Sequence, residues 1–506
     1  DGTADVASPD ATMKTYQQIE TGEVDAHEEA LSSVETRRST VAKLVGGLTA
    51  TFAVAAVYNH VGVSVSPSAS TLAASSTTAP SEAWKLRSDV QAMQKLKVVY
   101  GELDSDSVRG LFTKYKGDFN RNYATEEEED NRFEIFKLNL KHIDSLNYMN
   151  PLALFTITDA ADMTDDEKNL RKMSNKWSSY EGMKASLPAP ITELAAKGPD
   201  AAMGTKFEDA DLEGSEWLQK GQVGWVTEDD CAACTMFPDL VKYSLTNMPT
   251  DFDWRENGAV SSVKNQKYCG SCWTFSTAAD VEGTHFLATG NMTSMSEQQL
   301  IACDNMNDGC EGGWPYAAMQ YLETTAMVSA KDYPYKGIYM DYEQSVPTCD
   351  TDLLHEKMTK NSYDVAHVGG FQFVAMGADY EPLMALAMVK NGPLSIAFNA
   401  NGMEYYAHGI IGCETIAGED YCEAGSIDDH SPCDPESLDH AVLAVGIGVQ
   451  EGVQEDTDSS ADSTQYWVIK NSWGEEWGED GYYRLERGVN KCGVANMVVH
   501  SVVKDA

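Results

Sequence analysis

Basic residues are scarce in this chain of 506 residues, which has 37 Lys and Arg against 79 Asp and Glu and a formal net charge of −42. Because a nucleic-acid partner needs a basic face, this composition argues against DNA or RNA as the main partner. The sequence also has no internal repeat with a period of about 20–50 residues, which excludes a solenoid. Apolar residues make up 42% of the chain, enough for a sizeable core, so a wholly disordered protein is excluded as well.

The N-terminal region has two parts, an initial part without apolar periodicity and a following part without charged residues. Residues 1–43 are polar and acidic and are predicted to form a flexible tail. No Asp, Glu, Lys or Arg occurs between Leu44 and Ser81. A membrane-spanning helix needs about 20 apolar residues, so the apolar run 44–63 predicts a signal-anchor or an internal, cleavable signal, with everything later in the lumen. A buried helix is the alternative, but the Ser/Thr/Ala-rich linker 64–83 offers it nothing to pack against.

The rest of the chain divides into three segments by composition. Residues 84–170 carry apolar side chains at helical spacing, which predicts a helical region. Residues 171–245 have mixed composition, and we interpret them as an extension and linker. From residue 246 to 506, aromatic, glycine and cysteine residues become dense, which places the main folded domain there.

Cysteines are absent before Cys231, and nine of the eleven lie between Cys269 and Cys492. Such crowding indicates an oxidised, disulfide-bearing domain, and an odd number leaves one thiol unpaired. Cys231 and Cys234 have the spacing of two zinc ligands but no second pair, so a local disulfide is favoured over a metal site.

Cys272 is the candidate for the unpaired thiol. A helical pattern begins near Cys272 and ends at Gly290, and a thiol at a helix N-terminus is expected to favour the thiolate. A nucleophilic cysteine also needs an imidazole and a third group that orients it. His440 opens an apolar stretch and Asn471 closes another, so the two can meet at neighbouring strand ends.

Five stretches between residues 249 and 500 identify the domain as similar to papain-like cysteine proteases of the cathepsin-L-like branch: PTDFDWRENGAVSSVKNQKYCGSCWTFS, SEQQLIACD, GCEGGWP, LDHAVLAVGIG and KNSWGEEWGEDGYYRLERG. The resemblance implies an α+β fold of a helical and a β-barrel-like subdomain with the active-site cleft between them, preceded by a helical propeptide. It implies hydrolysis of peptide bonds in peptides and proteins, with no metal or cofactor. The implied roles are nucleophile for Cys272, acid and base for His440, orientation of the imidazole for Asn471, shielding for Trp473 and oxyanion binding for Gln266.

Two other functions are compatible with parts of this pattern. Cys269-x-x-Cys272 has the spacing of a redox pair, but a thiol–disulfide oxidoreductase has no use for the His440 and Asn471 segments. A catalytically inactive relative that acts as a binding protein usually lacks the nucleophile, which this chain keeps. The resemblance also implies the disulfides Cys269–Cys310, Cys303–Cys349 and Cys433–Cys492, and elimination leaves Cys413–Cys422.

The same resemblance implies the substrate contacts. Those residues are Gly312, Gly313, Trp314, Pro315, Ala397, Ala441 and Met497. No charge lines this pocket, which predicts apolar or aromatic substrate side chains at P2, although Ala397 and Met497 could be ordinary core residues. Residues 336–360 lack the paired histidines of carboxydipeptidases, which favours an endopeptidase. Insertions at about 410–435 and 449–465 leave the detailed specificity open.

A helical face in the N-terminal part resembles the inhibitory propeptide of cathepsin-L-like zymogens. Its spacing, E-x3-R-x3-F-x2-N-x3-I-x3-N, is met by Glu128, Arg132, Phe136, Asn139, Ile143 and Asn147. In the second family pattern, G-x-N-x-F-x-D, only Asp162 is kept. The resemblance implies intramolecular inhibition, removal at low pH shortly before Pro249, and a monomeric mature enzyme. Asn291 begins a glycosylation sequon, in keeping with an acidic lysosome- or vacuole-like lumen or with secretion.

Overall fold

The computed structural model describes residues 87–207, 222–336, 348–359, 364–412, 433–451 and 463–503, together with the backbone of 415–416 and 419–420. The acidic tail, the run 44–63, the linker, and the Cys413–Cys422 pair therefore lie outside the described residues. No helix among those described is both long enough and apolar enough to cross a membrane. Of two compact units, the first is described only at Tyr123–Glu128, and the second comprises Ala79–Asn122 and Glu129–Ala506.

The predicted helical region is confirmed between residues 87 and 170. Its helices are α4 (Ser88–Gln94), α5 (Ser105–Asp118), α6 (Glu126–Met149) and α7 (Asp165–Asn169). Asp104 caps α5 by accepting from the Ser107 N–H, and Thr164 and Glu167 form a capping box on α7. The Phe112 ring lies 5.2 Å from the rings of both Phe133 and Phe136, so α5 packs on α6 through aromatic side chains.

The polar residues of the propeptide pattern hold the loop that follows α6. Arg132 makes a bidentate contact of 2.6 Å with Glu167, and the Asn139 amide donates to the carbonyls of Ala161 and Met163. Asn147 exchanges two hydrogen bonds with the backbone of Phe155. Phe136 and Ile143 are buried, and Glu128 accepts from the Ala124 N–H at the start of α6. Asp162 accepts from the Tyr115 hydroxyl at 2.6 Å.

The helices of the main domain are arranged around one that is buried along almost its whole length, α11 (Cys272–Thr289), which ends at Gly290 in the left-handed conformation with φ 76°. The others are α12 (Glu297–Cys303), α13 (Pro315–Thr324), α14 (Thr351–Met358) and α15 (Glu381–Asn391). In the described residues Cys269 is bonded to Cys310, Cys303 to Cys349, Cys433 to Cys492 and Cys231 to Cys234. The first three are the pairs that the resemblance implied, and the fourth is the local disulfide predicted from spacing.

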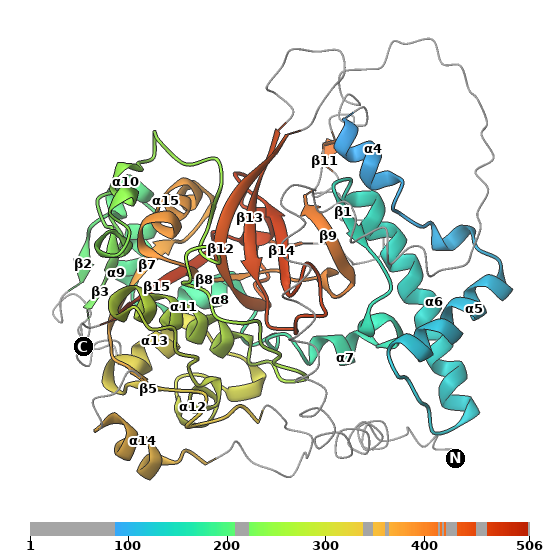
Figure 1. The fold of residues 1–506 in the computed structure, drawn as a ribbon, viewed down its shortest axis with the longest axis horizontal. Coiled ribbons are helices and arrows are strands. Elements are labelled where there is room, and N and C mark those ends of the chain that lie inside the picture. The colour runs from blue at the N-terminus through green and yellow to red at the C-terminus, as the bar shows by residue number, and fades with distance from the viewer. Residues whose placement is uncertain are drawn as a thin grey trace, which may run out of the picture. The chain divides into compact units, whose positions relative to one another are not determined.

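One large sheet has the strand order β1-β9-β14-β13-β12-β8-β15-β7-β3-β2 (Figure 1). Its bounds are β1 Ala153–Phe155, β9 Tyr406–Ile411, β14 Tyr482–Glu486, β13 Ser463–Lys470, β12 His440–Glu451, β8 Leu394–Phe398, β15 Met497–Val503, β7 Val368–Ala375, β3 Gln222–Trp225 and β2 Lys206–Phe207. Short β4 (Phe252–Asp253) pairs with β12, and β5 (Met327–Val328) pairs with β6 (Val365–Ala366). The predicted α+β class is confirmed.

The described residues between 171 and 245, which are 171–207 and 222–245, form more secondary structure than the predicted linker implies. They form α8 (Tyr180–Ser186), α9 (Ala189–Ala195), α10 (Pro199–Ala202), two 3-10 turns, and strands β2 and β3 at the end of the sheet. The residues that the sequence left without periodicity, such as Val223 and Trp225, are buried against the main domain. Strand β3 has only four residues and forms by pairing with β7, which is distant in the sequence. Its local sequence pattern therefore does not predict it.

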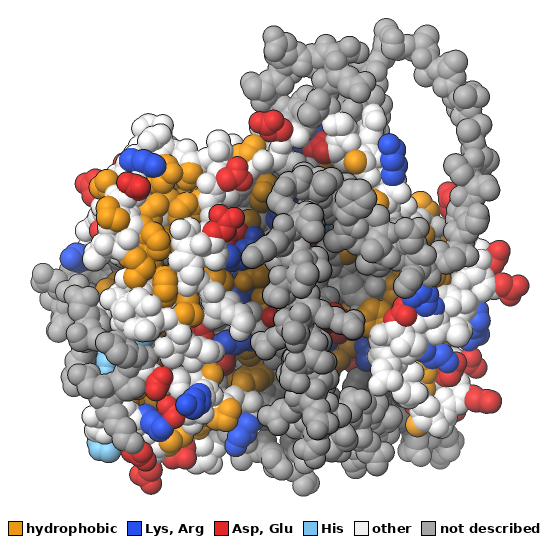
Figure 2. Space-filling model, viewed as in Figure 1, with side chains coloured by type: hydrophobic (Ala, Val, Ile, Leu, Met, Phe, Trp, Pro, Cys, Tyr) orange, Lys and Arg blue, Asp and Glu red, His pale blue; other side chains and the backbone are white. Residues whose placement is uncertain are grey.

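The surface agrees with the acidic composition. On the face drawn in Figure 2, Lys and Arg side chains stand singly among acidic and apolar ones, so the coloured residues of this face form no continuous basic patch.

Candidate active site

Cys272 is the first residue of α11 and is fully buried. It is the free cysteine among the cysteines that the structure describes. Its sequence neighbour Cys269 is bonded to Cys310, so the two do not form a redox pair. In the described part of the chain a free thiol therefore lies at a helix N-terminus, next to a disulfide that fixes the preceding turn.

His440 and Asn471 meet at neighbouring strand ends, as predicted. His440 is the first residue of β12, Asn471 follows the last residue of β13, and these two strands pair antiparallel. The distance from His440 Nε2 to Asn471 Oδ1 is 2.8 Å. The Trp473 ring lies 4.9 Å from the imidazole, at 35° to it. Asn471 can thus set the orientation of the ring without adding charge.

The N-terminal turn of α11 lies against the beginning of β12. The Ser276 hydroxyl donates to the Val442 carbonyl at 2.6 Å, and the Ala441 N–H hydrogen-bonds to the sulfur of Cys272. The Nδ1 atom of His440 is buried and has no hydrogen-bond partner in the described part of the chain. In the described residues one ring nitrogen of His440 therefore contacts Asn471, and the other has no hydrogen-bond partner.

Gln266 faces the same site. Its amide nitrogen donates to the carbonyls of Arg171, at 2.9 Å, and Cys269, at 2.8 Å. The hydroxyl of Ser472 donates to its amide oxygen at 2.6 Å, which fixes the orientation of the amide. The side chain that the resemblance assigns to the oxyanion thus already binds a peptide carbonyl oxygen, supplied by residue 171.

Residues 171–174 cross directly over the site. The Met173 N–H donates to the Asp439 carbonyl at 2.8 Å, and the Ser174 N–H donates to the Glu311 carbonyl at 2.9 Å. The carbonyl of Lys172 comes so close to Gly270 that a Cβ there would approach it to 2.5 Å. Residues 171–174 thus make backbone contacts close to both Cys272 and His440, and both of these side chains are fully buried.

Burial shifts the pKa values of the sulfur and of the imidazole in the directions that favour their neutral forms. Burial raises the pKa of Cys272 to about 12, although the Ala441 N–H opposes the shift. Burial also lowers the pKa of His440 to about 4, against the effect of the Asn471 hydrogen bond. The prediction that the helix N-terminus favours a thiolate considered the helix dipole alone, whereas burial shifts the pKa of Cys272 in the opposite direction.

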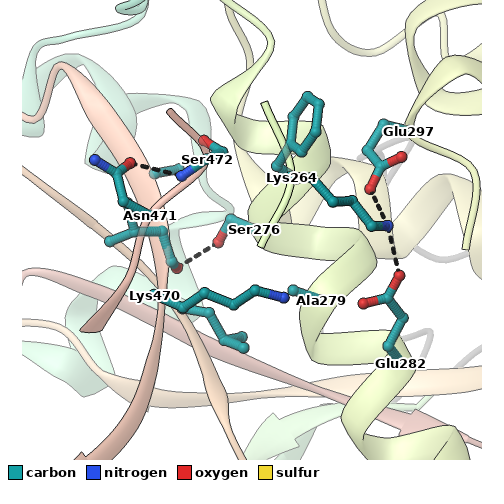
Figure 3. Close-up of a pocket in the computed structure, with 12 residues that line it drawn as sticks. Lys264, Ser276, Ala279, Glu282, Glu297, Lys470, Asn471 and Ser472 are labelled. Carbon is teal, nitrogen blue, oxygen red and sulfur yellow. Dashed lines mark hydrogen bonds and ion pairs between the residues drawn. The ribbon is translucent and has the colours of Figure 1, made fainter. Parts of the chain in front are cut away.

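Sequence reasoning missed a cluster of charges behind the site. Figure 3 shows the Lys264 ammonium between two carboxylates, at 2.7 Å from Glu282 of α11 and 2.5 Å from Glu297 of α12. Lys470, which precedes Asn471, donates to the Ser261 hydroxyl at 2.9 Å, and burial lowers its pKa to about 8. These groups tie α11, α12 and β13 together. The available signal was a lone lysine in the otherwise apolar strand YWVIK and a glutamate in a helix with little other charge.

A row of three side chains crosses β12, β8 and β15. Ala441 pairs with Ala397, and Ala397 pairs with Met497, so the three side chains point to the same face of the sheet. All three are buried, as are Trp314 and Pro315 at the start of α13. The row and α13 are the elements to which the resemblance assigns the P2 pocket.

Close backbone approach marks the two glycines of the predicted substrate site. Gly312 has φ 128°, and a Cβ there would lie 2.9 Å from the Trp177 ring. A Cβ on Gly313 would lie 2.4 Å from the side-chain oxygen of Asn307. Asn291 is exposed after the end of α11, where its amide donates to the Thr289 carbonyl at 3.2 Å.

Comparisons with known families match both parts of the chain. The model of the papain family of cysteine proteases matches residues 248–502. The model of the cathepsin propeptide inhibitor domain matches residues 112–167. In the described residues no group of three or more histidine, cysteine or acidic side chains is placed to hold a metal ion.

Individual relatives agree with these matches. Cysteine proteinase 15A of Pisum sativum is 35% identical over 397 residues, which cover 76% of this chain and 84% of the relative. Cysteine proteinase 1 of Dictyostelium discoideum is 30% identical and covers 78% of this chain and 92% of the relative.

Solved proforms share the fold. The digestive procathepsin L 3 of Tenebrio molitor larval midgut has a TM-score of 0.50 and 25% identity, covering 78% of this chain and 99% of that one. A recombinant stem bromelain precursor has a TM-score of 0.52 and 26% identity, covering 79% and 99%.

Proposed function

Because the chain belongs to the papain family of cysteine proteases, we propose that it is the zymogen of an endopeptidase that uses Cys272, His440 and Asn471 as its catalytic triad. The observation that carries this proposal is the 2.8 Å contact between His440 and Asn471, together with a free thiol held against the next residue of β12. Thiol-directed labelling of the acid-processed protein tests it, because only a reactive Cys272 would take the label.

The geometry supports a two-step acyl transfer. Cys272 Sγ attacks the carbonyl carbon of the scissile bond while its proton resides on His440. The Gln266 amide and the Cys272 N–H donate to the oxyanion that forms, in the place where the Arg171 carbonyl now lies. His440 then protonates the leaving amine, and water attacks the thioester to release the acid and restore the thiol.

We also propose that residues 84–170 inhibit the enzyme together with residues 171–174, which we call the inhibitory strand although they form no β-strand. These residues occupy the active site. Backbone contacts of residues 171–174 cover Cys272, and Thr158 of the loop before α7 donates to the Glu404 carbonyl at 2.8 Å. Inhibition is then steric and electrostatic, because a covered thiol stays protonated. Removal of this strand would readmit water and lower the cost of the thiolate–imidazolium pair.

A buried ion pair connects this inhibitory strand to the enzyme. The Lys172 ammonium lies 2.7 Å from Glu404 and 3.7 Å from Asp439, and both Lys172 and Glu404 are buried. Burial raises the pKa of Glu404, but Lys172 and Lys168 outweigh it, so the pKa is lowered overall. We call the form in which residues 171–174 cover the site the closed form. At a pH above its ordinary pKa, a carboxylate with a lowered pKa stabilises this form, and the contribution is lost as pH falls through the lowered pKa. Protonation of Glu404 in acid therefore weakens its contact with Lys172, while burial raises the pKa of Asp439 and acts in the opposite direction.

We expect Glu404→Gln to activate at higher pH than the parent zymogen. Breaking a buried pair costs about 3–5 kcal/mol, which corresponds to weaker closure by a factor on the order of 10² or more at neutral pH. The measurement is the rate of processing as a function of pH. Glu181→Gln is the control, because its partner Lys184 lies on the surface. A pH profile identical to that of the parent would contradict the role of this pair.

We propose that the P2 pocket is formed by Trp314, Pro315, Ala397, Ala441 and Met497. Met497→Glu is then expected to admit Arg at P2, because a carboxylate at the end of the row would pair with the guanidinium. The measurement is the cleavage profile of a peptide library by the processed enzyme. Met497→Gln, which has similar size and no charge, should not admit Arg. An unchanged profile for Met497→Glu would refute this pocket assignment.

The remaining features of the proposal follow from the sequence. We propose that the main domain, residues 246–506, is a monomeric endopeptidase in an acidic lumen or in secretions, reached through a signal or anchor at 44–63. We further propose that Asn291 carries a glycan, which its exposed position after α11 permits.

A further inference from the structure

The segment between the inhibitory region and Pro249 is built into the sheet of the main domain. Strand β3 pairs parallel with β7, from Gln222 beside Gly370 to Trp225 beside Phe373. The ladder continues past the strand, since the Val226 N–H donates to the Phe373 carbonyl at 3.1 Å. Strand β7 pairs on its other side with β15. Residues 222–226 therefore complete the hydrogen bonding of a strand that would otherwise be an open edge.

The side chains of this segment belong to the core. Trp225 is only 1% exposed, with its ring 5.5 Å from that of Phe373 and 5.2 Å from that of Tyr380. Val223 and Val226 are buried as well. Removing such side chains would expose the aromatic surface of β7 and of the turn before α15 to water, which costs free energy in proportion to the area uncovered.

The rest of the segment satisfies buried polar groups at the end of α15. The Lys390 ammonium donates to the Glu228 carbonyl at 2.6 Å, and the Ala232 N–H donates to the Asn391 side chain at 3.0 Å. Lys390 and Asn391 are both buried. Without residues 228–232 these groups would lose partners, and a buried donor without a partner is costly.

A second ring contact lies further along the segment. Phe237 stacks edge-on against Trp254 at 5.6 Å, and Trp254 is fully buried. The Cys231–Cys234 disulfide closes the turn between β3 and Phe237. The segment thus contacts β7, α15 and Trp254 along its length.

We infer that residues 222–245 remain with the mature peptidase as a permanent edge of its sheet, so that the processed enzyme begins at or before Gln222 and not shortly before Pro249. This inference rests on the proposed zymogen function only in assuming that the inhibitory region is removed. The separating step is hydrolysis of a peptide bond, in which water supplies the hydroxyl of the new carboxyl end and a proton of the new amine.

The test uses the full chain with Cys272→Ser, cut in acid by added pepsin, so that the result does not depend on the chain's own activity. After separation by gel filtration, N-terminal sequencing and intact mass define what remains with residues 246–503. We expect residues 222–245 to stay joined to this chain, so that its first residue is Gln222 or an earlier one. A stable product that begins between residues 246 and 249, with residues 222–245 lost, would overturn the inference.

A variant tests the same point through stability. Trp225→Ala should lower the Tm of the cut product by about 10 °C, because loss of a buried Trp side chain from a domain of this size has an effect of this order. Val241→Ala, at a position that is 70% exposed in the same segment, should leave the Tm unchanged. If the cut products of the parent and of the Trp225→Ala variant had the same Tm, the segment would have left, and the inference would be overturned.

Discussion

Replacing Cys272 with Ser is expected to abolish peptide hydrolysis by the processed enzyme, with a loss in kcat on the order of 10⁶-fold, as for other nucleophiles that act as part of a triad. The hydroxyl has almost the size of the thiol but does not ionise beside an imidazole, so His440 cannot generate the attacking anion. The measurement is the rate of cleavage of a fluorogenic peptide after removal of the inhibitory region by an added protease.

Two controls separate this effect from misfolding. The Tm of the Cys272→Ser protein should equal that of the parent, because Cys272 is buried but the change preserves its volume. The disulfide Cys269–Cys310 should also form, as judged by the absence of alkylation at both positions. Full activity in the Ser variant would show that another group attacks the substrate.

Replacing Gln266 with Ala should lower kcat by about 10²- to 10³-fold while changing KM little. The Gln266 amide is expected to donate a hydrogen bond to the oxyanion, which forms in the transition state and is absent from the bound substrate. Its loss therefore raises the activation barrier without weakening substrate binding. The measurement is the separate determination of kcat and KM on one peptide substrate.

The matched control is Gln450→Ala. The Gln450 amide donates to Asp89 of the propeptide at 2.9 Å, away from the site, and should not affect the processed enzyme. Gln266→Ala also removes the acceptor of the Ser472 hydroxyl, so Ser472→Ala should be measured beside it. An equal change in KM and kcat/KM, with kcat unaltered, would contradict an oxyanion role for Gln266.

The residues of the site could be predicted because each lies at a boundary that the sequence marks. The helical pattern beginning at Cys272 and ending at Gly290 corresponds to α11, Cys272–Thr289 with Gly290 at its end. His440 and Asn471 flank apolar stretches that become β12 and β13. Breaks in apolar runs, and glycines such as Gly290 at the end of α11, are the local signals that mark these boundaries.

What could not be predicted depends on contacts between distant segments. The cluster of Lys264, Glu282, Glu297 and Lys470 brings together groups from four places in the chain, and no spacing connects them. Strand β3 exists because β7 offers it a partner, so its four residues carry no periodicity of their own. The burial that raises the pKa of Cys272 likewise depends on contacts between distant segments, which local reasoning about the helix N-terminus leaves out.

The central claim is that the sulfur of residue 272 becomes a reactive nucleophile once the inhibitory strand is removed. The most direct test is reaction of the protein with an active-site-directed thiol epoxide, followed by mass spectrometry of its peptides. We predict one label, on Cys272, in acid-processed protein, little label in the intact zymogen at neutral pH, and none on Cys272→Ser after pepsin treatment. A fully processed protein that takes no label at Cys272 would contradict the account.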